Sequence, residues 1–547
     1  MHNDNSIENR QNLIYKAHSL NFTGEEFGMW KNIIQKSSIN TLLLEIYLFV
    51  VWSIYLFVNF YDGISNMISF LGLLLLCAIM VFFISRAIMS LISKIPSAQS
   101  TEFTRKKKIM SYCFFFLVSF GILFFWYMAY YPGAFSSDSL GQYTQAITGN
   151  YDDWHPVWHT LLFFTLPLTI TGKAASIIFF QIIYFSLVLG YLALCAYQFF
   201  NVKAAVIALA YILLNPCTGC IAMYPWKDAA MAITVLWSMV CVAKIYFTKG
   251  QWGEQKGRVL LAAFVLANAT LFRHNAILFT LPMVLALFFQ LNRKKWVGLA
   301  LLFFAFIFIV KVPVYSAMHV GKPGYRKVET LGLPLTVIGN VTKEYPQVLD
   351  EETSAFVHRL AAQEVWEEYY ICGSFGSIKG KIDKNVIEET NPLDILSMML
   401  RCFKAAPQSS CKAFFMLTDM VYAIEGPIEG DFSPGIEVNE LGIAYKGIET
   451  FKVFLQWYKQ TVTATVFKYI RYIGISILIM AAFILNRSDL RKWNDWKRIL
   501  LCVPIFIYDF GTMLLLMSAD ARFFYASFLA CPAVVLIMLK SGEEKLL

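Results

Sequence analysis

The chain has 547 residues, of which 58% are hydrophobic and 15% are charged, and its formal net charge is +9. Apolar runs of roughly 17 to 25 residues recur along it, the length that crosses the hydrocarbon core of a bilayer as a helix. These values exclude a soluble globular protein and predict an all-α polytopic membrane protein. The positive charge then indicates topology rather than a nucleic-acid partner, because Lys and Arg collect in cytoplasmic loops.

The first 39 residues are polar and precede an apolar run that is long enough to stay in the membrane. We therefore expect 1–39 to be an amphipathic cytoplasmic tail rather than a cleavable signal peptide. The eleven cysteines fall mostly inside apolar segments, which favours small buried side chains over a disulfide framework. Cys217 and Cys220 have CxxC spacing without a second pair, so they indicate a zinc or redox site only weakly.

Apolar stretches and the basic clusters between them predict the membrane topology. The stretches that we expect to cross the membrane are 41–60, 65–87, 109–131, 174–200, 203–224, 228–247, 259–272, 276–291, 296–312, 465–486, 498–518 and 522–540. With this bundle of about 12 transmembrane helices, every basic cluster falls on the cytoplasmic side and both termini are cytoplasmic. Nine helices lie in 40–313, and three lie in 465–547 together with a short cytoplasmic tail.

Two stretches depart from this pattern. The apolar piece 157–170 has ~14 residues, which is short for a full span, so we expect a helix along the outer interface. In 314–464 charges are frequent and apolar runs stop, which predicts a mainly helical, water-soluble extracytoplasmic insert close to a usual domain size. Periodic stretches such as 352–370 and 394–405 indicate helices within it.

The first outer loop, 132–157, concentrates polar groups beside the membrane, where unpaired polar groups are costly enough to need a reason. Ser136 or Ser137 can cap a helix that ends at Gly149. On that helix Asp138 and Gln142 share one face with Gln145, because they stand at i, i+4 and i+7.

Such a face could bind a sugar through Gln142 while Asp138 accepts a proton from an attacking hydroxyl. The alternative is that Asp138 only stabilises the helix start. Asp153 and His155, farther along the loop, could be a further base, metal ligands or supporting groups. His155 and His159 have the spacing of a metal pair, but Pro156 between them breaks the helical geometry, so the metal ligands stay unknown and a divalent metal stays open.

Cations are rare in the expected outer connections, and three of them stand at the mouth of a helix beside another polar residue. The three sites are Lys227 before Asp228, Arg273 before His274 and Asn275, and Arg522 after Asp520. Each cation alone could be an interfacial anchor or a salt-bridge partner. Together they favour an anion at the outer headgroup level. A diphosphate or phosphate on a lipid fits, since Arg binds it bidentately and Lys as a point charge.

These motifs carry a family resemblance. The segment from Pro132 to Ser139, with Gln142 and Asp153-Trp154-His155-Pro156 after it, resembles the first outer loop of GT-C-type integral membrane glycosyltransferases. It is most similar to a bacterial branch with a YPG…SxDSxxQ…DWHP signature. Trp226-Lys227-Asp228, Arg273 with Asn275, and Arg522-Phe523-Phe524-Tyr525 resemble later motifs of that branch. The likeness covers about 109–313 and 465–540.

The resemblance implies a GT-C-like fold, an active site on the outer face of the cell membrane and a polyprenyl-phosphate sugar as donor. It implies Asp138 as the residue of the acidic motif, with Lys227, Arg273 and Arg522 for the lipid phosphate. Beside these, we expect the neighbouring polar residues Gln142, Asp228 and Asn275 to bind sugar or acceptor. Asp138 is followed by Ser139, whereas the better known protein mannosyltransferases have two adjacent acidic residues. The base role of Asp138 therefore stays open. The acceptor (envelope glycan, lipid or protein) also stays open, because the insert 314–464 has no motif of the family.

Two other functional classes remain. A transporter or flippase of a lipid-linked saccharide or anionic envelope precursor would also need cations and carboxylates in a helical bundle, but nearer mid-membrane and usually with an internal repeat. A receptor or scaffold would use the outer insert and leave the first outer loop without a role.

Overall fold

The computed structural model describes residues 39–60, 67–96, 103–255, 257–322, 324–423 and 433–540. The predicted tail 1–39 lies outside these ranges except for its last residue, and the expected C-terminal tail lies outside them from 541 onward. Helices dominate the described part of the chain, which has no β-strand and only isolated bridges such as Phe135 with Ile436. The predicted all-α class is confirmed.

Seven helices in the described ranges are long and apolar enough to cross a membrane. They are α3 (Ile39–Phe60), α4 (Met67–Ser93), α5 (Arg105–Ala129), α9 (Ala175–Phe199), α12 (Lys227–Phe247), the continuous run Arg293–Ala317 that begins with α16 (Arg293–Ile309), and α29 (Ala521–Leu539). An eighth span results if the bent pair α10 (Val202–Leu213) and α11 (Pro216–Ala222) is counted as one. The membrane class is therefore supported, whereas the count of twelve stays a prediction.

The remaining predicted spans are helical but shorter than a full crossing. They are α14 (Arg258–Phe272), the stretch His274–Phe289 that contains α15 (Ile277–Ala286), α26 (Ile473–Arg487) and α28 (Val503–Met513). The predicted short helix after the first outer loop is also present, as Val157–Thr171, with α7 (Val157–Thr160) and α8 (Leu166–Thr171) joined by a π-helical turn.

Local sequence explains why α10 and α11 meet at a 65° bend. The Asn215 side chain accepts a hydrogen bond from the Cys217 amide and so caps a new helix start. Pro216 occupies the first turn, where its missing N–H is tolerated but where a continuous helix would lose a hydrogen bond. Helix α11 is followed after four residues by α12 (Lys227–Phe247).

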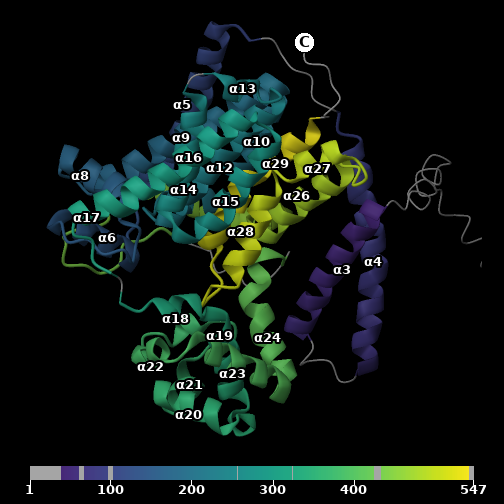
Figure 1. The fold of residues 1–547 in the computed structure, drawn as a ribbon, viewed down its shortest axis with the longest axis vertical. Coiled ribbons are helices and arrows are strands. Elements are labelled where there is room, and N and C mark those ends of the chain that lie inside the picture. Colours follow the sequence, from purple (N-terminus) through teal and green to yellow (C-terminus); the bar gives the residue numbers. More distant parts are fainter. Residues whose placement is uncertain are drawn as a thin grey trace, which may run out of the picture.

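Helix α12 is the centre of the helical body, and most of its side chains are buried. It packs against α9, α14 and α29, so residues at its N-terminus are fixed by helices from both halves of the chain. Helices α3 and α4 lie at one side of the body and contact α26 (Figure 1).

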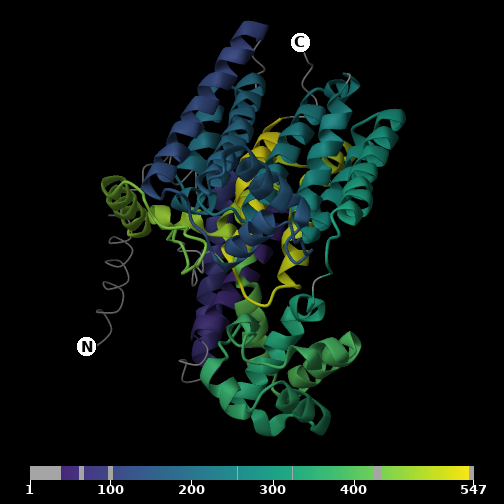
Figure 2. The same cartoon turned by 90° about the vertical axis from the view of Figure 1, so that its left-hand side faces the viewer.

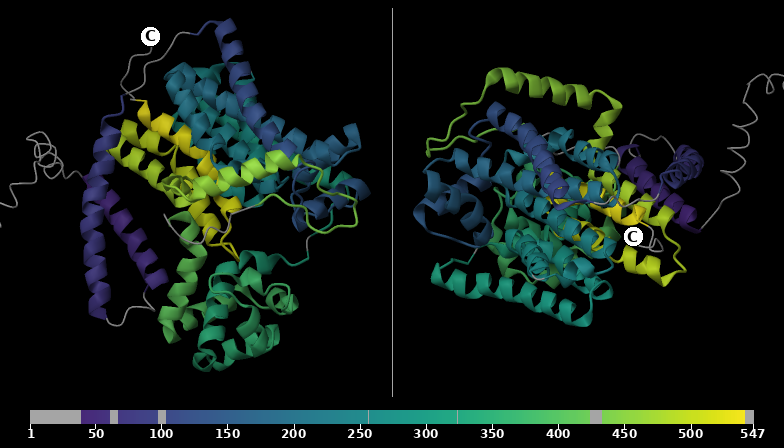
Figure 3. Two further views of the ribbon diagram at one scale, coloured as in Figure 1. Left: turned by 180° about the vertical axis from the view of Figure 1, so that it is seen from behind. Right: turned by 90° about the horizontal axis from the view of Figure 1, so that it is seen from above.

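The predicted insert has two parts. Its first part forms a helical lobe below the body (Figures 1 and 2), built from α18 (Arg326–Thr330), α19 (Gly332–Glu344), α20 (Glu351–Leu360), α21 (Gln363–Tyr369), α22 (Lys384–Glu389), α23 (Pro392–Ala405) and α24 (Pro407–Thr418). Its second part returns to the body, where α25 (Glu449–Thr463) packs against α5 (Figure 3). Within the lobe, α19 contacts α21, α23 and α24, and the rings of Trp366, Tyr370 and Phe375 are buried.

Candidate active site

Close packing on one side and a backbone hydrogen bond on the other hold the loop that leads into α6 (Ser137–Thr148). Gly133 has a φ of +122°, and a Cβ atom there would collide with the Ile178 side chain, so only glycine fits this turn. The Phe135 amide donates to the Gly435 carbonyl at 2.9 Å. The loop is therefore anchored to α9 and to the segment that precedes α25.

Helix α6 begins and ends where the sequence predicts. Gly149 closes it in the left-handed conformation, with φ +73°. Ser136 is the residue before its first turn, but its hydroxyl makes no cap and instead accepts a hydrogen bond from the Trp226 indole at 2.8 Å. This contact joins the start of α6 to the start of α12, and Asp138 follows in the first helical turn.

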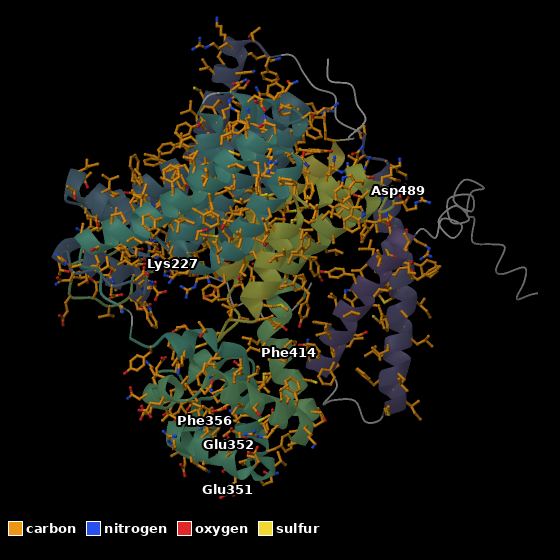
Figure 4. All side chains as sticks on the ribbon, in the orientation of Figure 1. Lys227, Glu351, Glu352, Phe356, Phe414 and Asp489 are labelled. Atoms are coloured by element: carbon orange, nitrogen blue, oxygen red, sulfur yellow. The ribbon has the colours of Figure 1, made fainter. Side chains whose placement is uncertain are left out.

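A cavity of about 720 Å³ opens between this loop, the ends of several body helices and the lobe. Figure 4 shows Lys227 at the edge of the body that faces the lobe, whereas Glu351 and Glu352 lie far down the lobe. The cavity wall includes eight of the nine site residues predicted from the sequence: Asp138, Asp153, His155, Lys227, Asp228, Arg273, Asn275 and Arg522.

Asp138 and Arg522 contact each other in this wall. The Arg522 Nη1 atom donates to the Asp138 Oδ2 atom at 3.2 Å, and its Nε lies 2.9 Å from the Asp520 carboxylate. The guanidinium also lies 4.9 Å from the ring centroids of Trp226 and Phe523. The Asp138 side chain is 36% exposed, so the carboxylate remains accessible to a ligand in the cavity.

His155 joins Asp138 to Lys227. The Lys227 ammonium donates to the His155 Nδ1 atom at 3.1 Å, which places the ring proton on Nε2. That Nε2 atom faces the Asp138 Oδ1 atom at 3.8 Å. The three predicted residues thus form a continuous row along one side of the cavity.

The third predicted cation, Arg273, is engaged by its neighbours. It has extended backbone angles between α14 and the next short helix, and this break turns its side chain toward the cavity. Its guanidinium pairs with Asp228, which is only 2% exposed, and its Nε donates to the Asn275 side chain at 2.6 Å. Asn275 in turn donates to Thr512 at 3.0 Å, so α28 helps to orient Arg273.

A second polar cluster surrounds Asp153. Lys311 lies 2.9 Å from the Asp153 carboxylate, the Tyr315 hydroxyl donates to it at 3.1 Å, and His274 Nε2 lies 3.7 Å away. None of these three partners is among the predicted site residues. One signal could have revealed Lys311, because it is an isolated cation within the apolar stretch 296–312, and such embedded charges are functional-site candidates.

Gln142 is the predicted site residue that does not line the cavity. It is buried, and its amide nitrogen lies 2.9 Å from both His159 Nδ1 and Thr160 Oγ1. Its partners are thus side chains of α7, and the helix face shared with Asp138 divides between the cavity and the protein interior. The described residues contain no group of three or more His, Cys, Asp or Glu side chains that could hold a metal ion.

The charges of the site set the protonation states of its acid and its histidine. Burial raises the pKa of the Asp138 carboxyl, but the nearby cationic groups, Arg522 foremost, outweigh burial and leave that pKa below its ordinary value. Burial, reinforced by the Lys227 charge, lowers the pKa of His155 to about 3. Asp138 is therefore ionised and His155 neutral near pH 7, while burial raises the pKa of Asp520.

Among the described residues, the cavity wall carries five cations (Lys227, Arg273, Lys311, Lys379 and Arg522) and five carboxylates (Asp138, Asp153, Asp228, Glu329 and Asp520). Four of the cations form ion pairs with these carboxylates. Within the same described set, Lys227 forms no ion pair with a carboxylate and contacts the neutral His155 instead. Its charge is therefore the one most available to an anionic ligand.

Searches against models of protein families, curated proteins and solved structures find no match for this chain.

Proposed function

We propose that this protein is a GT-C-type glycosyltransferase, which moves a sugar from a polyprenyl-phosphate carrier to an acceptor hydroxyl. The observation that carries the proposal is the convergence of Asp138, Lys227 and Arg522 in one cavity, with the Arg273–Asp228 pair beside them. An enzyme that transfers sugar from a lipid phosphate needs an acid–base group and a cationic phosphate site within reach of one substrate.

The donor phosphate would bind at Lys227, whose charge has no carboxylate partner within the described part of the chain. Arg522 would share the phosphate through the planar donors that also contact Asp138. Both groups stabilise the negative charge that grows on the leaving phosphate as the bond between sugar and phosphate breaks. Arg273, held by Asp228 and Asn275, adds positive potential and shapes the wall.

In the reaction, the acceptor oxygen attacks the anomeric carbon, the bond from that carbon to the phosphate oxygen breaks, and Asp138 takes the hydroxyl proton. Attack from the side opposite the phosphate inverts the anomeric configuration. Because Arg522 holds the pKa of Asp138 down, a donor phosphate that attracts Arg522 makes Asp138 a better base. Binding of the donor would then prepare the site for the acceptor.

The same proposal includes the orientation of the chain. In this orientation the chain crosses the membrane twelve times and both termini are cytoplasmic. The helix Val157–Thr171 lies along the outer interface, and the cavity and the lobe lie outside the cell membrane. In its favour, α13 (Gln251–Glu254) and α27 (Trp493–Ile499), which adjoin basic clusters, lie at the end of the body away from the lobe (Figure 1).

The test is release of free lipid phosphate from polyprenyl-phosphate hexoses by the purified full chain, with an envelope glycan fraction as acceptor source. Wild-type protein should release lipid phosphate and form a glycosylated product, whereas Asp138→Asn at equal protein level should not. A flippase would move the lipid across vesicle membranes without releasing lipid phosphate, so translocation without release would replace the enzyme proposal by the transporter alternative.

A further inference from the structure

The lobe contributes residues to the cavity wall, and the proposed binding of the donor phosphate does not involve these residues. Glu329 and Thr330 come from α18, and Gly376 and Lys379 come from the segment after α21. The lobe is thus a component of the site rather than a separate module. Its wall faces the cavity beside Trp154, the residue between Asp153 and His155 in the first outer loop.

We propose that this lobe wall, together with Trp154, is an acceptor subsite for a neutral saccharide. The inference rests on the proposed function, because it concerns the second substrate of the same cavity.

The charged side chains at the lobe end of the cavity form ion pairs with one another. Lys379 pairs with Glu329, and Lys311 pairs with Asp153 at 2.9 Å, so the cations at this end of the cavity already have carboxylate partners. An anionic acceptor would have to compete with the Glu329 and Asp153 carboxylates for these ammonium groups, and both carboxylates would repel it. A sugar hydroxyl can instead accept from an ammonium and donate to a carboxylate at the same time.

Trp154 presents an aromatic ring at the same end of the cavity. Its indole ring is partly exposed to the cavity, and Lys379 Nζ lies 5.1 Å from the ring centroid. The Trp154 backbone amide donates to the Asp152 carboxylate at 2.9 Å, which helps to fix the residue in the loop. An aromatic face with a polar tip beside a charged pair suits the apolar face and the hydroxyl rim of a sugar ring.

The position of the lobe also supports this subsite. Ser374 and Ser518 contact each other through their hydroxyls at 2.6 Å, and the Gly376 amide donates to the Met517 carbonyl at 3.2 Å. These contacts fix the lobe to the turn before α29, which carries Arg522. The cavity of about 720 Å³ lies in the upper part of the ~300–1,000 Å³ range of ligand pockets, which leaves space beside the donor phosphate for part of a second ligand.

The experiment measures saccharide binding directly, on the purified full chain in detergent, by saturation-transfer difference NMR. The probes are neutral gluco-, galacto- and rhamno-oligosaccharides, a glycerol-phosphate oligomer and a serine-rich peptide. The variants are Trp154→Ala, Trp154→Phe and the charge-balanced double change Glu329→Gln with Lys379→Met. Arg401→Ala is the matched control, because Arg401 pairs with Asp350 and Glu352 within the lobe and does not line the cavity.

We expect the wild type and the Arg401→Ala control to bind at least one neutral oligosaccharide and neither of the other probes. Trp154→Ala and the double variant should weaken that binding at least tenfold, and Trp154→Phe should retain part of it. Binding of the glycerol-phosphate oligomer or the peptide instead, no saccharide binding, or equal binding by Trp154→Ala would each overturn the proposal.

A second probe separates this proposal from the proposed function. Binding of short-chain polyprenyl phosphate should be unchanged in Trp154→Ala and weakened in Lys227→Met. Normal lipid-phosphate binding and release with no saccharide preference would reject only the acceptor subsite. Absence of lipid-phosphate release in every protein would reject the transferase itself.

Discussion

The Asp138 carboxylate and the Arg522 guanidinium lie 3.2 Å apart although 384 positions separate them in the chain. The contact joins the first turn of α6 to the first turn of α29 at the edge of one cavity. It has two consequences, because the same guanidinium lowers the basicity of the carboxylate and offers donors to an anion. The pH dependence of the proposed reaction should therefore depend on Arg522.

Arg522→Gln should shift the acid limb of the transfer reaction to higher pH. Removal of the guanidinium removes the foremost group that holds the Asp138 pKa down, so the carboxylate takes up its proton at a higher pH as the solution is acidified. The measurement is the pH profile of kcat/KM for sugar transfer. Arg359→Gln, which changes an exposed pair in the lobe, is the control, and an acid limb identical in both variants would argue against this coupling.

Lys227→Met should raise the KM for the donor, while Lys227→Arg should retain part of the affinity. A hydrogen bond to a charged group contributes ~1.5–3 kcal/mol, which corresponds to roughly 10- to 100-fold in affinity. The check is donor KM against acceptor KM in one assay. Lys173→Met is the matched control, since Lys173 is an exposed cation that does not line the cavity. A donor KM that stays within a factor of two would remove Lys227 from the phosphate site.

The apolar stretches and the short helices could be predicted because each signal is local. Gly149 ends α6, as a glycine after a helical stretch predicts. Arg273 separates two short helices, as a polar turn between two apolar stretches predicts. The pairing of charges could not be predicted, because Arg522 meets Asp138 only after the bundle has formed. The sequence therefore identifies Arg273 as a cation at the start of a helix, but it does not reveal that Arg273 forms an ion pair with Asp228.

The contacts of Gln142 and of the lobe could not be predicted either, because they also depend on how distant parts of the chain pack. Helical periodicity correctly places Gln142 on the face that carries Asp138, but it cannot tell that α7 covers the second half of this face. The lobe residues Glu329 and Lys379 carry no motif, and they reach the cavity only through the docking of Ser374 and Gly376 near α29.

Asp228→Asn should destabilise the protein through Arg273 rather than through a substrate contact. Removal of one partner from a buried ion pair leaves an uncompensated charge and costs ~3–5 kcal/mol. Thermal melting in detergent should show a large decrease in melting temperature. The double change Asp228→Leu with Arg273→Met should recover most of it, because no unpaired charge remains, whereas additive losses would contradict the pairing.

Gln142→Ala should lower stability and leave both KM values unchanged in the protein that remains folded. Its amide satisfies the buried side chains of His159 and Thr160, and an unsatisfied buried polar group costs ~1–3 kcal/mol. Melting temperature and steady-state kinetics should be measured together. A raised acceptor or donor KM with unchanged melting temperature would restore Gln142 as a substrate ligand.

His155 should make the folded protein sensitive to acid. Its pKa is about 3 in the structure, against an ordinary value near 6.5, because burial and Lys227 disfavour the charged ring and the Asp138 carboxylate only partly compensates. Between these two values the unfolded chain binds a proton that the folded chain does not. The free energy of unfolding therefore falls as the pH decreases through this window.

His155→Gln removes this proton and keeps an acceptor for Lys227, so its melting temperature should fall less than that of the wild type between pH 7.5 and pH 5. The control is His358→Gln, an exposed histidine on α20 that should leave the wild-type decrease unchanged. A decrease of equal size in His155→Gln and wild type would mean that the Lys227 contact does not keep this ring neutral. In that case His155, which lies between Lys227 and Asp138, would carry a positive charge in the folded protein.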